Sequence, residues 1–382
     1  MITRRKFNRG LTAFGAMAGG AGILSQAGSA RAAMNTTNPL AHGFNMPEEA
    51  APHERTFMQW PANLKVYKYR EDLEAVQEAI ALIANTINRF EPVVMLAAKG
   101  EHALIRSMTD DIEIWDIPTD DLWCRDASCN FVLNSAEELA AVNLNFNGWG
   151  KKQPHANDAK VSQRIAQKLG LHLFNNDLVG EAGGVEYDGR ANLIAHESSW
   201  VNDNRNPGMS RDEVSELIKQ AYGAKHMVWA PGIKGADITD YHIDALARFT
   251  PSGAIIIQMP DELDKSDPWS VAAFQTNKIF SNAVNDKGRA FEMITLPEPT
   301  RVRSKSDDFV ASYVNYYVCN GAVITAEFGD DKTDQAAVEI LGKAYPGREI
   351  VALNIDAIGE SGGGIHCATH EQFASKAIWK PQ

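Results

Sequence analysis

The sequence is short of cysteine and has no cluster with the spacing of a metal site. Only four cysteines occur among 382 residues, at Cys124, Cys129, Cys319 and Cys367. No C-x-x-C pair is present, and no group of His and Cys residues has zinc-site spacing. Aspartates near His242 are the alternative set of metal ligands, but we predict no metal and no cofactor.

Positive charge is also scarce, which argues against a nucleic-acid partner. Lys and Arg total 37 against 49 Asp and Glu, so the formal net charge is −12. Five positive charges lie in residues 1–32, which contain no acid, and the rest of the chain therefore carries −17. Such a surface repels nucleic acid and suits a cationic substrate, although solubility alone would also explain it.

The apolar run near the N-terminus is too short to span a bilayer comfortably. Residues 11–24 are mildly apolar and rich in glycine, and they follow the paired arginines Arg4 and Arg5. Small residues at 30–32 resemble a cleavage site, so we predict a twin-arginine-type signal peptide at 1–32 and a single domain at 33–382. We expect export to the periplasm or beyond, without stable membrane insertion after cleavage.

Apolar residues recur at helical spacing in five longer segments, which alternate with strand-like runs. The helices are expected to begin near Glu71, Asp158, Arg211, Trp269 and Lys332. The strand-like runs are 92–98, 112–118, 130–134, 171–176, 191–196, 226–231, 254–260, 291–297, 312–318, 322–328 and 349–355. From Asp158 onward the helix starts lie roughly 50 to 65 residues apart, and the longer spacing before it requires an inserted segment. This pattern predicts an alternating α/β domain.

Near the end of the chain, a single thiol follows a glycine-rich segment. Within 361–371, three glycines precede Cys367 and allow positive φ and close approach of a substrate to the backbone. The residues after the glycines can form a short strand. This setting suits a nucleophile, but a turn with a buried, inert cysteine has the same sequence features.

A second segment, 236–249, combines two acids with an imidazole. In an extended chain, side chains two apart share a face, so Asp240, His242 and Asp244 would project into one cleft. An acidic edge exposed to solvent is the alternative interpretation.

A third segment, 117–134, places Asp126 at a turn between a tryptophan and an apolar strand. Asp120 and Asp121 lie just upstream. A thiol, an imidazole and several carboxylates are therefore available for one site.

These groups together favour a cysteine hydrolase that modifies a guanidine. A guanidinium is a flat cation that two carboxylates can grip through paired N–H···O bonds. Held between Asp126 and Asp244, its central carbon would face Cys367. His242 could protonate departing ammonia and then activate water. His366 is a poorer candidate for this proton transfer, because adjacent residues of a strand face opposite sides.

Six motifs occur along the chain in one characteristic order. They read MPEEAAPHERTFMQWPAN, PTDDLWCRD, FNGWGKK, DITDYHID, ASYVNYYVCNGAVI and GGGIHC. Together they resemble the agmatine deiminase and bacterial peptidylarginine deiminase family of the guanidine-modifying superfamily. The resemblance covers essentially everything after the leader, and it implies a five-fold pseudo-symmetric α/β propeller, the pentein fold. The active site of this single deiminase domain would then lie in the central channel.

The resemblance also implies roles for individual residues. Cys367 would be the nucleophile, His242 the acid/base, and Asp126 and Asp244 the carboxylates that grip the guanidinium. Residues with expected substrate-binding roles are Trp60, Trp123, Asp120, Glu186, Asp240 and Asn315. Trp149 could wall a cation pocket with Trp60 and Trp123, or all three could pack in the core.

Two departures from the family pattern remove polar side chains. Gly364 stands where the agmatine-type motif usually has Asn, and Gly184 stands where Asn is common. Both concern how the far end of the substrate is held. The expected reaction is hydrolysis of agmatine to N-carbamoylputrescine and ammonia through a covalent thiouronium. Deimination of free or peptidyl arginine to citrulline is the alternative, and homo-oligomerisation is left open.

Two other classes of protein share some of these features. A catalytically quiet, exported binding protein for cationic guanidines or polyamines would use the same acidic cleft. A papain-like peptidase fits less well, because the cysteine lies at the wrong end of the chain and no His and Asn pair follows it. Elsewhere, the polar loop 201–213 is expected to place Arg205 on the surface and to cap the following helix with Ser210.

Overall fold

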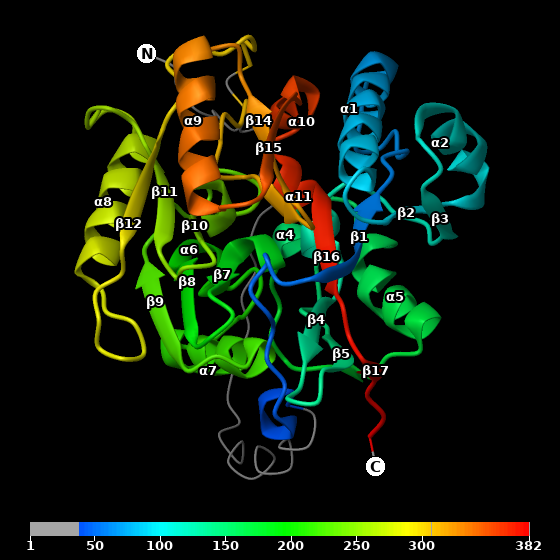
Figure 1. Cartoon of the computed structure of the whole chain (residues 1–382), viewed down its shortest axis with the longest axis horizontal. Coiled ribbons are helices and arrows are strands. Elements are labelled where there is room, and N and C mark those ends of the chain that lie inside the picture. The colour runs from blue at the N-terminus through cyan, green and yellow to red at the C-terminus, as the bar shows by residue number, and fades with distance from the viewer. Residues whose placement is uncertain (1–37, 307, 382) are drawn as a thin grey trace, which may run out of the picture.

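The computed structural model describes residues 38–306 and 308–381, and in this part of the chain five small sheets are arranged in a ring. Each sheet follows one plan, in which an antiparallel strand pair is extended by a third strand parallel to the second. A long helix precedes that third strand, as a parallel connection requires. Figure 1 shows these five helices spread around the periphery of the molecule. The predicted α/β class and its repeated unit are confirmed.

The elements of the five sheets have the following bounds. The first sheet contains β16 (Thr369–Phe373), β1 (His53–Gln59), β2 (Val93–Ala97) and β3 (Glu113–Asp116), with helix α1 (Arg70–Asn88). The second contains β4 (Asn130–Leu133), β5 (Glu138–Val142), β6 (Leu173–Phe174) and β17 (Ala377–Ile378), with α5 (Val161–Leu169). The third contains β7 (Val185–Tyr187), β8 (Asn192–His196) and β9 (His226–Ala230), with α7 (Arg211–Tyr222). The fourth contains β10 (Ala247–Phe249), β11 (Ile255–Met259) and β12 (Met293–Pro297), with α8 (Pro268–Asn282). The fifth contains β13 (Tyr317–Cys319), β14 (Ala322–Glu327) and β15 (Glu349–Asn354), with α9 (Asp331–Ala344).

Shorter helices connect these units. They are α2 (His102–Met108), α3 (Cys124–Ala127), α4 (Gly148–Lys151), α6 (Glu197–Trp200), α10 (Asp356–Glu360) and α11 (Ile365–Ala368). The 3-10 turns are η2 (Leu40–His42), η3 (Lys99–Glu101), η4 (Asp158–Lys160), η5 (Ala182–Gly184) and η6 (Ile243–Ala245). The α2–β3 segment adds a fourth strand to the first sheet, and it is the insertion that the longer helix spacing required.

Local sequence signals explain where the long helices begin and end. Helix α1 buries Leu73, Val76 and Ile80 at a spacing of three and four residues, which places them on one face. The side chain of Ser210 accepts from the Glu213 backbone N–H at the start of α7, and a reciprocal bond completes a capping box. The predicted cap is confirmed.

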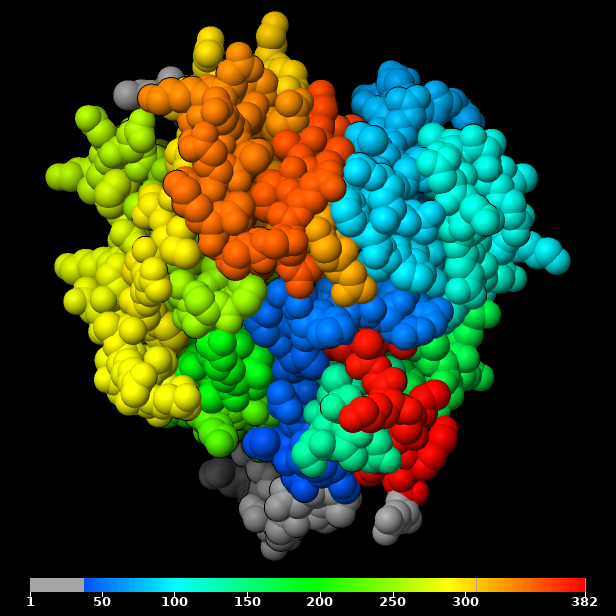
Figure 2. Space-filling view, viewed as in Figure 1, coloured from blue at the N-terminus to red at the C-terminus, as the bar shows by residue number. Residues whose placement is uncertain are grey.

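The ring is closed by strands from the two ends of the described chain. Strand β1 pairs antiparallel with β16, with Met58 opposite Thr369. Figure 1 shows the blue β1 running beside the red β16, and in Figure 2 blue and red parts of the chain meet on the same face. Because α11 directly precedes β16, this pairing holds Cys367 in place near the centre of the ring.

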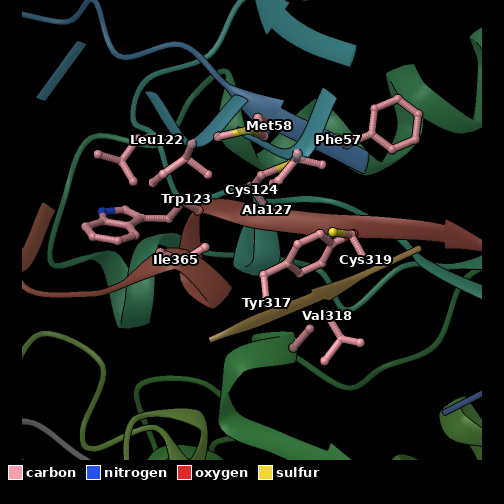
Figure 3. Close-up of a cluster of buried hydrophobic side chains, with 14 of the residues drawn as sticks. Phe57, Met58, Leu122, Trp123, Cys124, Ala127, Tyr317, Val318, Cys319 and Ile365 are labelled. Atoms are coloured by element: carbon pink, nitrogen blue, oxygen red, sulfur yellow. The ribbon is translucent and has the colours of Figure 1, made fainter. Parts of the chain in front are cut away.

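A buried apolar cluster packs against α11 through Ile365. Figure 3 shows side chains from four separate segments packed together: Phe57 and Met58 of β1, Leu122, Trp123, Cys124 and Ala127 around α3, Tyr317, Val318 and Cys319 of β13, and Ile365 of α11. These segments come from distant parts of the sequence, so their packing fixes the relative positions of the polar residues they carry. No helix in the described ranges is long and apolar enough to cross a membrane. The predicted signal peptide at 1–32 lies outside the described residues and stays a prediction.

Candidate active site

The four residues predicted to be catalytic line one cavity of about 190 Å³. Asp126 lies on α3, His242 and Asp244 lie at η6, and Cys367 lies on α11. Three different repeats thus contribute to the same space. Trp123 and Trp149 also line it, which agrees with the proposal that aromatic rings wall a cation pocket.

A glycine marks the point where three of these side chains meet. A Cβ atom on Gly183 would lie 2.9 Å from Asp244 Oδ2, 2.9 Å from His242 Nδ1 and 3.0 Å from Asp126 Oδ1. Such contacts are too short for any side chain, so only glycine fits beneath the three polar groups. The backbone N–H of Gly183 donates to Asp126 Oδ1 at 3.1 Å, which helps to orient that carboxylate.

His242 lies between two carboxylates. Its Nδ1 is 3.7 Å from Asp126 Oδ2, and its Nε2 is 3.3 Å from Glu181 Oε2. Burial alone would lower the pKa of His242, but Asp126 and Glu181 outweigh it and raise the pKa to about 9. The ring therefore carries a proton at neutral pH and can donate it.

The two aspartates have different environments. Burial raises the pKa of Asp126 to about 6, and the neighbouring carboxylates of Glu181 and Asp244 add to the effect against the opposing charge of His242. For Asp244, burial acts in the same direction, but hydrogen bonding and charge from His366 hold its pKa below the usual value. Asp244 is thus the better anion of the pair at neutral pH.

The thiol of Cys367 lies next to Asp244. Its Sγ is 3.5 Å from Asp244 Oδ2 and accepts a hydrogen bond from the Asn315 side-chain amide at 3.1 Å. Burial raises the pKa of Cys367 well above its usual value, and the negative charges of Asp244 and Asp126 raise it further. The free site therefore holds a neutral thiol, and a bound cation would favour the thiolate.

His366 takes part in the site by an unexpected route. Residues 365–368 form a helical turn instead of the expected strand, so the alternation that would turn His366 away does not apply. Its Nδ1 lies 2.8 Å from Asp244 Oδ2 and its Nε2 lies 2.9 Å from Glu49 Oε2. His366 thus contacts the Asp244 carboxylate but does not itself line the cavity.

The expectation that Asp240, His242 and Asp244 share one face was wrong for Asp240. The chain is not extended here, because Asp240 and Tyr241 have positive φ and η6 follows. The Asp240 carboxylate turns away from the cavity and accepts from Lys152 Nζ and from Arg205 Nη1, both at 2.7 Å.

Three more of the expected substrate-binding residues do not line the cavity. Asp120 accepts from the backbone N–H of Asn157 at 2.6 Å and holds the loop before α5. Glu186 accepts from Arg248 Nε at 3.0 Å in a separate buried ion pair. Trp60 is buried in the apolar core. Of the remaining two, Trp123 lines the cavity, and Asn315 contacts the sulfur of Cys367.

Several residues of the site were not indicated by any pattern in the sequence. Glu181 contacts His242 and also accepts from Arg205 Nε at 2.8 Å. Arg205 was expected on the surface, but only 3% of it is exposed, because it pairs with both Glu181 and Asp240. A polar loop that carries Arg, Asn and Asp is normally predicted to be exposed, because the sequence does not show which residues pair with these side chains. Tyr67, which also lines the cavity, donates to Asp121 Oδ1 at 2.6 Å.

All four cysteines are free thiols in the structure. Cys124, Cys129 and Cys319 are buried, and burial raises the pKa of each. Cys367 is the partly exposed one and the one that reaches the cavity. In the described ranges, no group of three or more His, Cys, Asp and Glu side chains is arranged to hold a metal ion.

Comparison with known proteins gives one consistent family. A model described as Porphyromonas-type peptidyl-arginine deiminase matches residues 45–372. An agmatine deiminase from Medicago truncatula is 30% identical, with 88% of this chain and 98% of its own length covered. An agmatine deiminase from Pseudomonas aeruginosa is 30% identical, with 89% and 98% covered. The solved structure of agmatine deiminase from Enterococcus faecalis matches with a TM-score of 0.82 and 25% identity, over 88% of this chain and 97% of that chain.

Proposed function

Because the chain belongs to the Porphyromonas-type peptidyl-arginine deiminase family, we propose that it hydrolyses a guanidine and that agmatine is its substrate. One observation carries the proposal: a thiol, an imidazole and two carboxylates line a single small cavity. These are the groups that nucleophilic attack on a guanidinium needs.

In the first half of the reaction, the guanidinium lies between Asp126 and Asp244. Their carboxylates accept its N–H groups and neutralise its charge. The positive charge of the substrate offsets the two acids that disfavour the thiolate of Cys367. The proton of the Cys367 thiol passes to solvent as the thiolate forms. The sulfur then forms a bond to the central carbon, His242 gives its proton to one nitrogen, and the bond between that nitrogen and carbon breaks. Ammonia leaves and a thiouronium remains on the sulfur.

In the second half, water replaces the sulfur. The imidazole of His242, now neutral, accepts a proton from a water molecule as its oxygen bonds to the thiouronium carbon. The proton of the added hydroxyl passes to the departing sulfur as the carbon–sulfur bond breaks and the carbonyl of the product forms, so Cys367 is regenerated as a thiol. The products of agmatine and water are N-carbamoylputrescine and ammonia, so all atoms are accounted for.

The lining of the cavity favours agmatine over arginine. Among the residues that the structure describes, no Lys or Arg side chain lines it, whereas Asp121 and Asp237 do so in addition to the two catalytic aspartates. A carboxylate at the far end of free arginine would therefore find no Lys or Arg side chain to pair with in the described lining and would be repelled by the aspartates. An amine at that end would be attracted.

The test is a substrate panel with purified protein. We expect ammonia release with agmatine, at least about tenfold faster than with free arginine or an arginyl peptide, since one unmatched charge is worth at least that factor. Mass spectrometry of the quenched reaction should find the substrate-derived adduct on Cys367. Faster release from the peptide would assign peptidylarginine deimination instead. Binding of agmatine without ammonia from any guanidine would support the binding-protein alternative.

The pH dependence of kcat/KM should be bell-shaped. The rising limb reflects ionisation of Cys367, whose thiol is disfavoured as an anion in the free site. The raised pKa of His242 means that the proton required by departing ammonia is present below about 9 and lost above it, so the rise should level off near pH 9. The fall should follow only above the pKa of Cys367, which burial raises well above its usual value. Ammonia release measured from pH 6 to 10 checks this. A profile flat from about pH 6 to 9 would contradict these assignments.

A further inference from the structure

We propose that Asn315 is a catalytic residue that stabilises the reactive, anionic form of the Cys367 sulfur when it forms, instead of a residue that binds substrate. This inference rests on the proposed function, since it concerns the same nucleophile. It starts from three hydrogen bonds that join the Asn315 segment to the turn that carries Cys367.

The orientation of the Asn315 side chain is fixed by its partners. Its Oδ1 accepts from the backbone N–H of Cys367 at 3.2 Å, so this atom must be the amide oxygen. The Nδ2 group is then free to donate to Cys367 Sγ at 3.1 Å and to the backbone oxygen of Asp244 at 3.2 Å. The assignments of oxygen and nitrogen in the amide agree with each other. The two acceptors, Cys367 Sγ and the Asp244 backbone oxygen, face Nδ2, and the backbone N–H of Cys367 faces Oδ1.

The backbone of Asn315 strengthens the same arrangement. Its carbonyl oxygen accepts from the N–H of His366 at 3.1 Å. Asn315 therefore contacts α11 at two consecutive N–H groups and at the sulfur. Because the residue is 1% exposed and does not line the cavity, it reaches the sulfur from outside the cavity.

Gly364 makes room for this side chain. A Cβ atom at position 364 would lie 2.6 Å from Asn315 Oδ1 and 2.9 Å from its Cγ. The backbone of Gly364 is extended, which any residue can adopt, so its conformation does not require glycine. The lack of space beside Asn315 does require it. A larger residue at position 364 would therefore displace the Asn315 amide.

The chemical consequence concerns the charge on sulfur. Asp244 and Asp126 both oppose ionisation of Cys367, and the Asn315 N–H is a neutral donor that favours the thiolate without competing for the guanidinium. A hydrogen bond to a charged group contributes more than one between neutral groups. Loss of this donor should leave about tenfold less thiolate at a given pH.

The experiment measures the thiol directly. The rate of alkylation of Cys367 by iodoacetamide, followed by mass spectrometry of that peptide, is recorded against pH for the wild type and for Asn315→Ala. We expect alkylation of N315A to be about tenfold slower in the range where the wild-type thiol is partly ionised, with the curve moved to higher pH. The kcat for agmatine should fall in parallel, while KM changes little.

Two further variants make the result decisive. Gly364→Ala keeps Asn315 but pushes its amide away from the sulfur, so it should move the alkylation curve in the same direction even if N315A folds poorly. Asn192→Ala removes a buried asparagine of β8 that bonds Asp188 and Asp286 outside the cavity, and it should leave the curve unchanged.

Other outcomes would overturn the proposal. An alkylation curve for folded N315A that superposes on the wild type, or a rise in KM without a fall in kcat, would assign Asn315 to structure or to substrate binding. The alkylation assay needs no turnover. It therefore tests this inference even if the protein released no ammonia from any guanidine, which is the result that would remove the proposed function itself.

Discussion

Replacing Cys367 by serine is expected to lower agmatine turnover by a factor on the order of 10⁴ or more. The hydroxyl of serine is a far weaker nucleophile than a thiolate, and within residues 38–306 and 308–381 the one base hydrogen-bonded to the sulfur is the Asp244 carboxylate, at 3.5 Å. The variant should still bind agmatine, because the carboxylates that hold the cation are unchanged. Ammonia release and thermal stabilisation by agmatine, measured on the same sample, separate the two effects.

The control for this variant is another cysteine. Cys319→Ala removes a buried thiol that packs in the apolar cluster of Figure 3, and it should keep turnover close to that of the wild type. The adduct detected by mass spectrometry should be absent from C367S and present in C319A. Turnover by C367S within about a hundredfold of the wild type would mean that the thiol is not the nucleophile.

Replacing Asp244 by asparagine is expected to reduce kcat/KM by roughly 10³-fold, or about 4 kcal/mol. This side chain is fully buried and contacts the thiol and His366, and its pKa is held low by His366. The amide keeps the shape but removes the charge that grips the guanidinium. It also leaves His366 without its anionic partner on one side. Steady-state kinetics with agmatine gives the measurement.

The matched control is Asp188→Asn. Asp188 is also buried and accepts several hydrogen bonds, including those from the backbone of Arg190 and Ala191, but it does not line the cavity. D188N should change stability more than it changes kcat/KM. Equal losses of kcat/KM in D244N and D188N would indicate that the D244N effect is structural and would argue against the gripping role.

Much of the architecture followed from the sequence because its long elements are periodic. All five long helices begin within a few residues of their predicted starts, since their apolar faces repeat every three or four residues. The strands β1, β7, β10 and β16 are only three to seven residues long and have no apolar repeat of this kind that would predict them. The run 312–318 was expected to be a strand throughout, yet β13 begins only at Tyr317. The irregular part before it carries Asn315, whose hydrogen bonds go to α11 instead of to a neighbouring strand.

The candidate site was predictable in its reactive groups and less so in its supporting ones. The chemistry of a thiol, an imidazole and carboxylates indicated Cys367, His242, Asp126 and Asp244, and the structure places these four around one cavity. Residues such as Glu181 act through contacts with partners more than fifty positions away. Spacing along the chain cannot reveal such contacts.

The pairing of β1 with β16 has a consequence for how the protein is made. Strand β1 finds its antiparallel partner only after strands β2 to β15 have been synthesised, and the sulfur nucleophile lies on the helical turn just before β16. A nascent chain that stops before Cys367 lacks both the closing strand and its reactive atom. Catalytic competence and closure of the ring are therefore acquired in the same step.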